Sequence, residues 1–129
     1  MIELLVVLTI VVILASIGLP AFLSQRAKAH DTDAKATTRT AVGAIEVYYQ
    51  DHDSSYVGVT TAALEAIEPA LASARNLVVT GTADEFTISV DSASGDAGGG
   101  PFEVKRTNGS TERTCAVPGH GSCPQSGKW

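Results

Sequence analysis

The chain has little positive charge and few residues of the kinds that build catalytic sites. Its 129 residues include 9 Lys and Arg against 14 Asp and Glu, a formal net charge of -5. A protein of this charge does not attract nucleic acid or anionic lipid through its overall field. There is no phosphate-binding glycine loop, nucleophile elbow or paired-cysteine zinc pattern. We therefore expect a protein that is not an enzyme, with no catalytic residues, no metal site and no cofactor.

No charged residue occurs between Leu4 and Leu23. The exceptions to apolar side chains there are Thr9, Ser16, Gly18 and Pro20. As a helix this stretch is roughly 30 Å long, which matches the hydrocarbon core of a bilayer. A cleavable secretory signal would have a basic segment and a shorter apolar core, whereas here an acid, Glu3, precedes the run. Residues 1–25 are thus predicted to be an apolar helix that lies in a membrane or in the core of a filament. A helix that serves only as a plain membrane anchor remains an alternative.

The helical pattern continues beyond the apolar run. Side chains recur at three- and four-residue spacing through Ala41, Val42, Ile45, Tyr48, Tyr49 and His52. This predicts one helix from about Ile2 to about Asp53, in which residues 26–53 are amphipathic. The acids beside His30, Asp31 and Asp33, are expected to be solvated helix surface and not metal ligands.

Two helix-weakening residues lie inside this long helix. In a helix interior a proline costs about 3 kcal/mol and a glycine about 1 kcal/mol. Gly18 and Pro20 therefore predict either a tolerated kink, which membrane helices permit, or a segment that melts when its surroundings change.

Residues 54–129 predict a small β-sheet head. "TTAALEAIEP" indicates a short helix with Thr61 as its N-cap. Partial alternation and β-branched residues favour strands in "NLVVTG", "EFTISVD", "PFEVKRT" and "STERTCAV". Asn108-Gly109 is typical of a two-residue hairpin turn, and "DSASGDAGGGP" is expected to be a flexible surface loop that does not pack.

The expected fold class is therefore α+β. The apolar half of the long helix protrudes, and the stripe around Ile45 and Tyr48 packs against three or four antiparallel strands.

The two cysteines, Cys115 and Cys123, lie close together near the end of the sequence. A zinc site would need more ligands, and only His120 lies between them. In a chain directed to a membrane they favour a disulfide formed in an oxidising compartment.

A small basic patch is expected on the last hairpin, from Lys105, Arg106 and Arg113. Such a patch on an exposed face would suit contact with DNA or another surface. Ordinary solvated strand edges are the alternative interpretation.

Glu3 is a lone carboxylate at the edge of the apolar run. At a lipid interface it could stay solvated. In a bundle of such helices it would enter an apolar interior, where a charge is tolerated only when it is paired. The α-amino group of a neighbouring copy is the expected partner, so that Glu3 would set the axial register of the bundle.

The segment "IELLVVLTIVVILASIGLPAF" resembles the N-terminus of the type IV pilins. Members of that family begin, after leader removal, with an N-methylated Phe, and a Glu follows a few residues later. The resemblance implies that Glu3 is the assembly glutamate, that Gly18 and Pro20 form the helix break, and that Cys115 and Cys123 close a disulfide loop. It also implies that a leader and one or two mature residues precede Met1.

The resemblance implies a structural subunit that forms a helical homo-oligomer, the pilus or fimbrium. It would reside in the cytoplasmic membrane, in contact with lipid, before assembly and in an extracellular filament afterwards. A prepilin peptidase and an assembly motor would be its partners, and adhesion, surface motility or DNA uptake its roles. A pseudopilin of a secretion machine and a membrane-anchored module that never polymerises are the alternatives.

Overall fold

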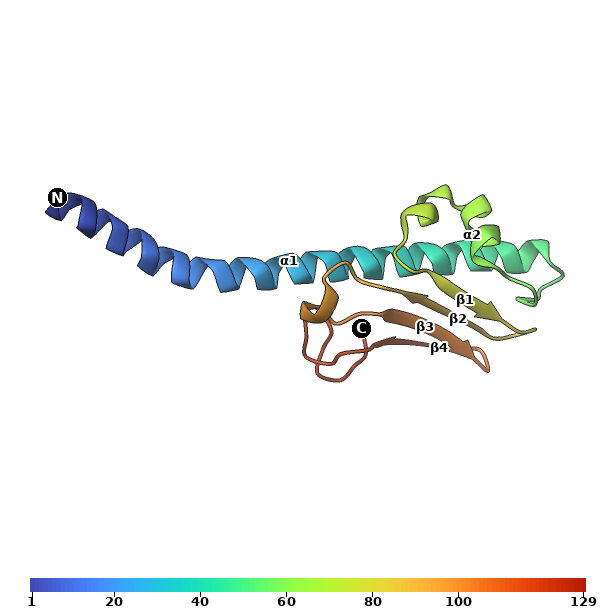
Figure 1. Cartoon of the computed structure of the whole chain (residues 1–129). Helices are drawn as coiled ribbons and strands as arrows, with labels where there is room; N and C mark the ends of the chain where they lie inside the picture. The colour runs from blue at the N-terminus through green and yellow to red at the C-terminus, as the bar shows by residue number, and fades with distance from the viewer.

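A computed structural model describes residues 1–129 and has a long helix with a small head on its second half (Figure 1). Helix α1 spans Ile2–Asp51, 50 residues. The head then contains α2 (Thr61–Ile67), a 3₁₀ turn η1 (Pro69–Ser73), strands β1 (Val78–Gly81) and β2 (Phe86–Val90), a second 3₁₀ turn η2 (Gly95–Ala97), and strands β3 (Phe102–Thr107) and β4 (Ser110–Cys115). The expected α+β class, with the apolar half of the helix protruding, is confirmed.

The four strands form one antiparallel sheet in the order β1-β2-β3-β4. Ile88 of β2 lies opposite Val104 of β3, so their side chains share a face. Thr107 pairs with Ser110, and Asn108 and Gly109 between them have φ angles of 51° and 78°. A two-residue type I′ turn requires a positive φ at both of its central residues. The predicted hairpin is therefore confirmed.

The core lies between the sheet and one face of α1. The buried helix residues are Ala27, Asp31, Ala34, Thr38, Ala41, Ala44, Ile45 and Tyr48. The sheet contributes Phe86, Ile88, Val90, Phe102 and Val104. Packing on the stripe around Ile45 and Tyr48 is therefore confirmed. His52 does not belong to it, because its ring is exposed and stacks on Tyr48 with centroids 3.8 Å apart.

The prediction for the N-cap of the short helix α2 was wrong by one residue. Thr60 has extended backbone angles, and its hydroxyl accepts a hydrogen bond from the amide of Ala63 at 3.2 Å. The hydroxyl of Thr61 instead donates to the carbonyl of Leu77 at 3.4 Å. The adjacent threonines are chemically alike, so only the position where the chain turns into the helix distinguishes them.

Cys115 and Cys123 form a disulfide, as expected. Both are buried, and the bridge closes the loop that lies beside the end of the sheet. A loop of this length contributes roughly 2.5 kcal/mol in the chain-entropy model.

We expect the double variant Cys115→Ala/Cys123→Ala to lose about 2–3 kcal/mol in the free energy of unfolding, because the unfolded chain is no longer constrained. Urea unfolding of the full chain in detergent, followed by tryptophan fluorescence, measures this loss. Wild-type protein kept under reducing agent is the control and should unfold at a similarly lowered urea midpoint. An unchanged midpoint in both samples would contradict the prediction.

Candidate assembly site and its supporting contacts

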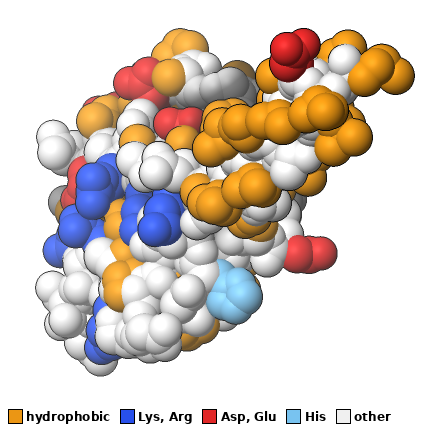
Figure 2. All heavy atoms as spheres, turned by 90° about the vertical axis from the view of Figure 1, so that its left-hand side faces the viewer, with side chains coloured by type: hydrophobic (Ala, Val, Ile, Leu, Met, Phe, Trp, Pro, Cys, Tyr) orange, Lys and Arg blue, Asp and Glu red, His pale blue; other side chains and the backbone are white.

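The first half of α1 has no contact with the head. From Ile2 to Leu23 the large apolar side chains are between 51% and 81% exposed, and the first buried residue is Ala27. Figure 1 shows this half extending away from the head, and Figure 2 shows its apolar side chains uncovered. It is the one helix long and apolar enough to cross a membrane by length and composition. So large an exposed apolar surface marks a site of contact with lipid or protein.

Glu3 lies in the first turn of α1, exposed and without an ion pair inside the subunit. The next cationic side chain along the helix, Arg26, is about 35 Å away. No side chain of its own subunit can therefore neutralise Glu3 if the segment enters an apolar environment.

The polar side chains of the apolar half are satisfied inside the helix. The hydroxyl of Thr9 donates to the carbonyl of Leu5 at 2.8 Å, and that of Ser16 donates to the carbonyl of Ile13 at 2.7 Å. The segment can thus be covered by lipid or by other helices without an unpaired hydroxyl.

Gly18 and Pro20 do not interrupt α1 in the single subunit, since the helix includes both. Figure 1 shows α1 bending along this half. That arrangement matches the tolerated kink, and the melted segment stays a prediction for the assembled state.

Asp31 connects α1 to two loops of the head. Its side chain is fully buried. One carboxylate oxygen, Oδ1, accepts from the hydroxyl of Ser94 at 2.8 Å. The other, Oδ2, accepts from the backbone amides of Gly99 at 2.9 Å and Ser122 at 2.8 Å. A single carboxylate therefore holds the β2–β3 connection and the disulfide loop against the helix.

These contacts overturn two expectations from the sequence. Asp31 is not solvated surface, and the glycine-rich segment 91–101 packs against α1. The segment comes close because its glycines lack side chains: a Cβ at Gly98 would meet Asp31, and one at Gly99 would meet Cys123. The loop composition that indicated flexibility instead permits close backbone approach.

The environment of Asp31 favours its charged form. Burial alone would raise the pKa of the carboxyl, but hydrogen bonds from Ser92, Ser122, Gly99 and Ser94 together lower it below its usual value. One turn along the helix, Lys35 donates from Nζ to the carbonyl of Ser122 at 2.6 Å. Burial is the main cause that lowers the pKa of Lys35, and the charge of Asp31 opposes it.

A signal for Asp31 was present in the sequence. Spacings of three and four residues, followed backwards from Tyr48 and Ile45, pass through Ala41, Thr38 and Ala34 and then reach Asp31. The buried stripe therefore extends further than its apolar members alone indicated.

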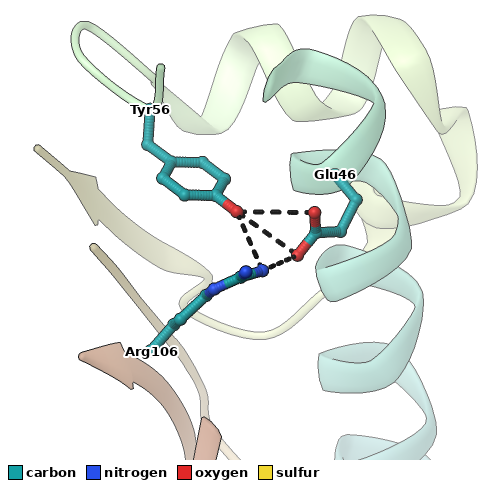
Figure 3. Close-up of polar contacts among 3 residues, drawn as sticks. All are labelled: Glu46, Tyr56 and Arg106. Atoms are coloured by element: carbon teal, nitrogen blue, oxygen red, sulfur yellow. Dashed lines mark hydrogen bonds and ion pairs between the residues drawn. The ribbon is translucent and has the colours of Figure 1, made fainter. Parts of the chain in front are cut away.

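A second polar cluster links α1, the loop after it and β3 (Figure 3). Arg106 donates from Nη1 to Glu46 Oε1 at 2.8 Å and to the hydroxyl oxygen of Tyr56 at 3.2 Å. The Tyr56 hydroxyl donates to the two Glu46 oxygens at 3.3 and 3.4 Å. Burial, followed by the charge of Glu46, raises the pKa of Tyr56.

The three residues of the predicted basic patch do not share one surface. Arg106 faces α1 and pairs with Glu46, whereas Lys105 is exposed on the opposite face of the sheet. Arg113 lies beside the ring of Trp129. Alternation along β3 separates the two consecutive cations, which the sequence grouping did not take into account.

No group of three or more His, Cys, Asp or Glu residues is placed to hold a metal ion. In the comparisons, no family model matches the chain and no curated protein matches it.

Proposed function

We propose that this chain is a structural subunit of a type IV pilus, which polymerises through its apolar helix into an extracellular helical filament. One observation carries the proposal: an apolar segment from Ile2 to Leu23, uncovered on every side, continues as the same helix into a folded head. In water such a segment must be covered, and either lipid or neighbouring copies can cover it.

The two covered states are close in free energy, which suits a subunit that is stored and then assembled. Lipid tails and neighbouring helices are about equally apolar, so the hydrophobic effect hardly distinguishes them. Packing and polar contacts decide between them, and Glu3 is the charged group in this segment. It would pair with the N-terminal amine of a neighbouring copy.

The head is suited to the outside of such a filament. The sheet face turned away from α1 carries polar side chains, among them Thr87, Ser89, Glu103 and Lys105. The disulfide suits an oxidising compartment outside the cytoplasm. Adhesion, surface motility and DNA uptake are the roles that a filament of this kind would serve.

The proposal is tested by imaging the full chain. Purified protein is transferred from detergent to detergent-free buffer and examined by negative-stain electron microscopy. Long regular filaments support a pilus subunit, and short stubs that stop growing would support a pseudopilin instead. A parallel sample is transferred from detergent into lipid vesicles. If the protein stays monomeric there and forms no fibres in buffer at any concentration, it is an anchored module and the proposal is overturned.

The segment from Ile17 to Ala21 is expected to lose its helix in the filament, because Gly18 and Pro20 make it the least stable part of α1. The melted segment would let the filament extend under load. Cryo-electron microscopy of the fibre checks this prediction, and a continuous helix through these residues would refute it. A Gly18→Ala/Pro20→Ala variant should keep the helix intact and form fibres that stretch less in an optical trap.

A further inference from the structure

Three cationic side chains gather around the indole ring of Trp129. The Nζ atom of Lys35 lies 5.7 Å from the ring centroid, and the guanidinium carbons of Arg39 and Arg113 lie 5.3 and 5.7 Å from it. We call Lys35, Arg39, Arg113 and Trp129 the Trp129 cluster. The ring is held in place, since its Nε1 donates to the carbonyl of Thr114 at 2.7 Å.

No residue of the Trp129 cluster forms an ion pair within the subunit, although the charge of Asp31 acts on Lys35. The two ion pairs of the chain are Arg106 with Glu46 and Lys128 with Glu112. Lys35 reaches only a carbonyl oxygen, and Arg39 and Arg113 are exposed. Three like charges held at one ring repel one another, so this surface is suited to an anionic partner.

The far end of the head carries the opposite charge. Asp51 and Asp53 lie at the end of α1, and Asp84 and Glu85 lie in the β1–β2 turn. The amide of Tyr56, which closely follows Asp53, donates to the carbonyl of Thr82 at 3.1 Å and so joins the two segments. None of the four carboxylates has an ion pair in the subunit. We call these four residues the acidic tip.

We propose that the Trp129 cluster of one copy receives the acidic tip of a second copy, an inference that rests on the proposed filament function. Figure 2, viewed from the end where the apolar helix projects, shows Lys and Arg side chains gathered beside that helix. The tip lies at the opposite end of the head (Figure 1). Copies that point the same way along one axis thus present opposite charges to each other.

The spacing along α1 gives the geometry of the contact. Residues 35–39 and 51–53 are separated by about 20 Å of helix. Two parallel copies shifted by about this distance bring the cluster of one level with the tip of the other. The two surfaces differ, so the contact is heterologous and each copy keeps one free cluster and one free tip for the next. Such a contact propagates without closing and gives the growing filament its direction.

Charge reversal tests the contact in the full chain. The variant Arg39→Glu/Arg113→Glu should lower the amount of sedimentable filament at least tenfold, because like charges then face each other. The matched control Lys105→Glu/Arg75→Glu changes the net charge equally at exposed positions outside the cluster, and should stay within about twofold of wild type. Adding Asp51→Lys/Asp53→Lys/Asp84→Lys to the first variant gives the acidic tip a net positive charge opposite the now net negative cluster, and should recover most of the filament.

The outcomes separate this inference from the function on which it rests. Fibres formed equally by wild type, the reversed variant and the control would overturn the contact while leaving the filament function intact. Failure of wild type to form fibres would overturn both. A third outcome is that the reversed variant assembles normally but, unlike wild type, is not retained on a heparin column. That result would assign the cluster to a soluble polyanion and overturn its assignment to a second copy. Circular dichroism of each variant checks that the head remains folded.

Discussion

Neutralising Glu3 is expected to abolish filament formation while the chain remains in the membrane. In the proposed bundle, Glu3 and the amine of a neighbouring copy meet in an apolar interior. Removing one partner of a buried ion pair leaves the other uncompensated, at a cost of roughly 3–5 kcal/mol. Because every copy repeats the contact, Glu3→Gln and Glu3→Ala should each lower sedimentable filament by at least about 100-fold.

Membrane insertion should respond differently to the same change. The apolar run from Leu4 to Leu23 is untouched, and loss of a charge only makes the segment more apolar. Vesicle flotation should therefore recover Glu3→Ala as completely as wild type. Glu103→Gln on the outer face of the sheet is the control and should assemble normally. Normal fibres from Glu3→Ala would remove the basis for a register function of this residue, and a membrane-anchored monomer would become the better interpretation.

Replacing Asp31 with Asn is expected to destabilise the head by about 2–4 kcal/mol, with loss of the docked loops. Both amides that face Oδ2, those of Gly99 and Ser122, need an acceptor. An Asn side chain either presents its NH₂ group to these donors or turns it toward Ser94, and it loses the negative charge in both cases. Thermal unfolding of the full chain in detergent measures the effect. Asp33→Asn, two residues along on the exposed side of α1, should change stability by less than about 0.5 kcal/mol.

The same carboxylate predicts how stability depends on pH. Hydrogen bonds hold the pKa of the Asp31 carboxyl in the folded state below the ordinary value of an aspartate. Its contribution is therefore complete above the pKa of an unfolded aspartate and is lost as the pH falls from there through the lower folded pKa. Wild type should lose stability more steeply than Asp31→Asn below about pH 4, so the two unfolding curves should converge. Parallel pH dependences would show that the carboxylate is not charged in the fold.

Sequence patterns of short range predicted most of the secondary structure. The long helix followed from hydropathy and three- and four-residue spacing, and the last hairpin from Asn108-Gly109, whose left-handed backbone angles few other pairs adopt. The strands followed from β-branched residues bounded by turns. These features depend only on residues that are close together in the chain, so they can be predicted from a single sequence.

Contacts between distant segments could not be predicted in the same way. Asp31 bonds to residues 63 to 91 positions away, and Arg106 pairs with Glu46 across 60. A buried carboxylate looks like a surface one until its donors are known, and those donors are mostly backbone amides that carry no residue-type signal. The basic patch was misjudged for a related reason, since strand alternation and the return of Trp129 to β4 decide which cations meet.

Cleavage of α1 would let the head leave the membrane. Since one face of α1 is part of the core, the boundary between the residues that the head can lose and those that it needs falls just before Ala27, the first buried residue. A protease that cuts at Gln25 would shed a water-soluble particle with its interior complete. A cut only a few residues later, beyond Asp31, would instead take away the carboxylate that holds both loops against the helix.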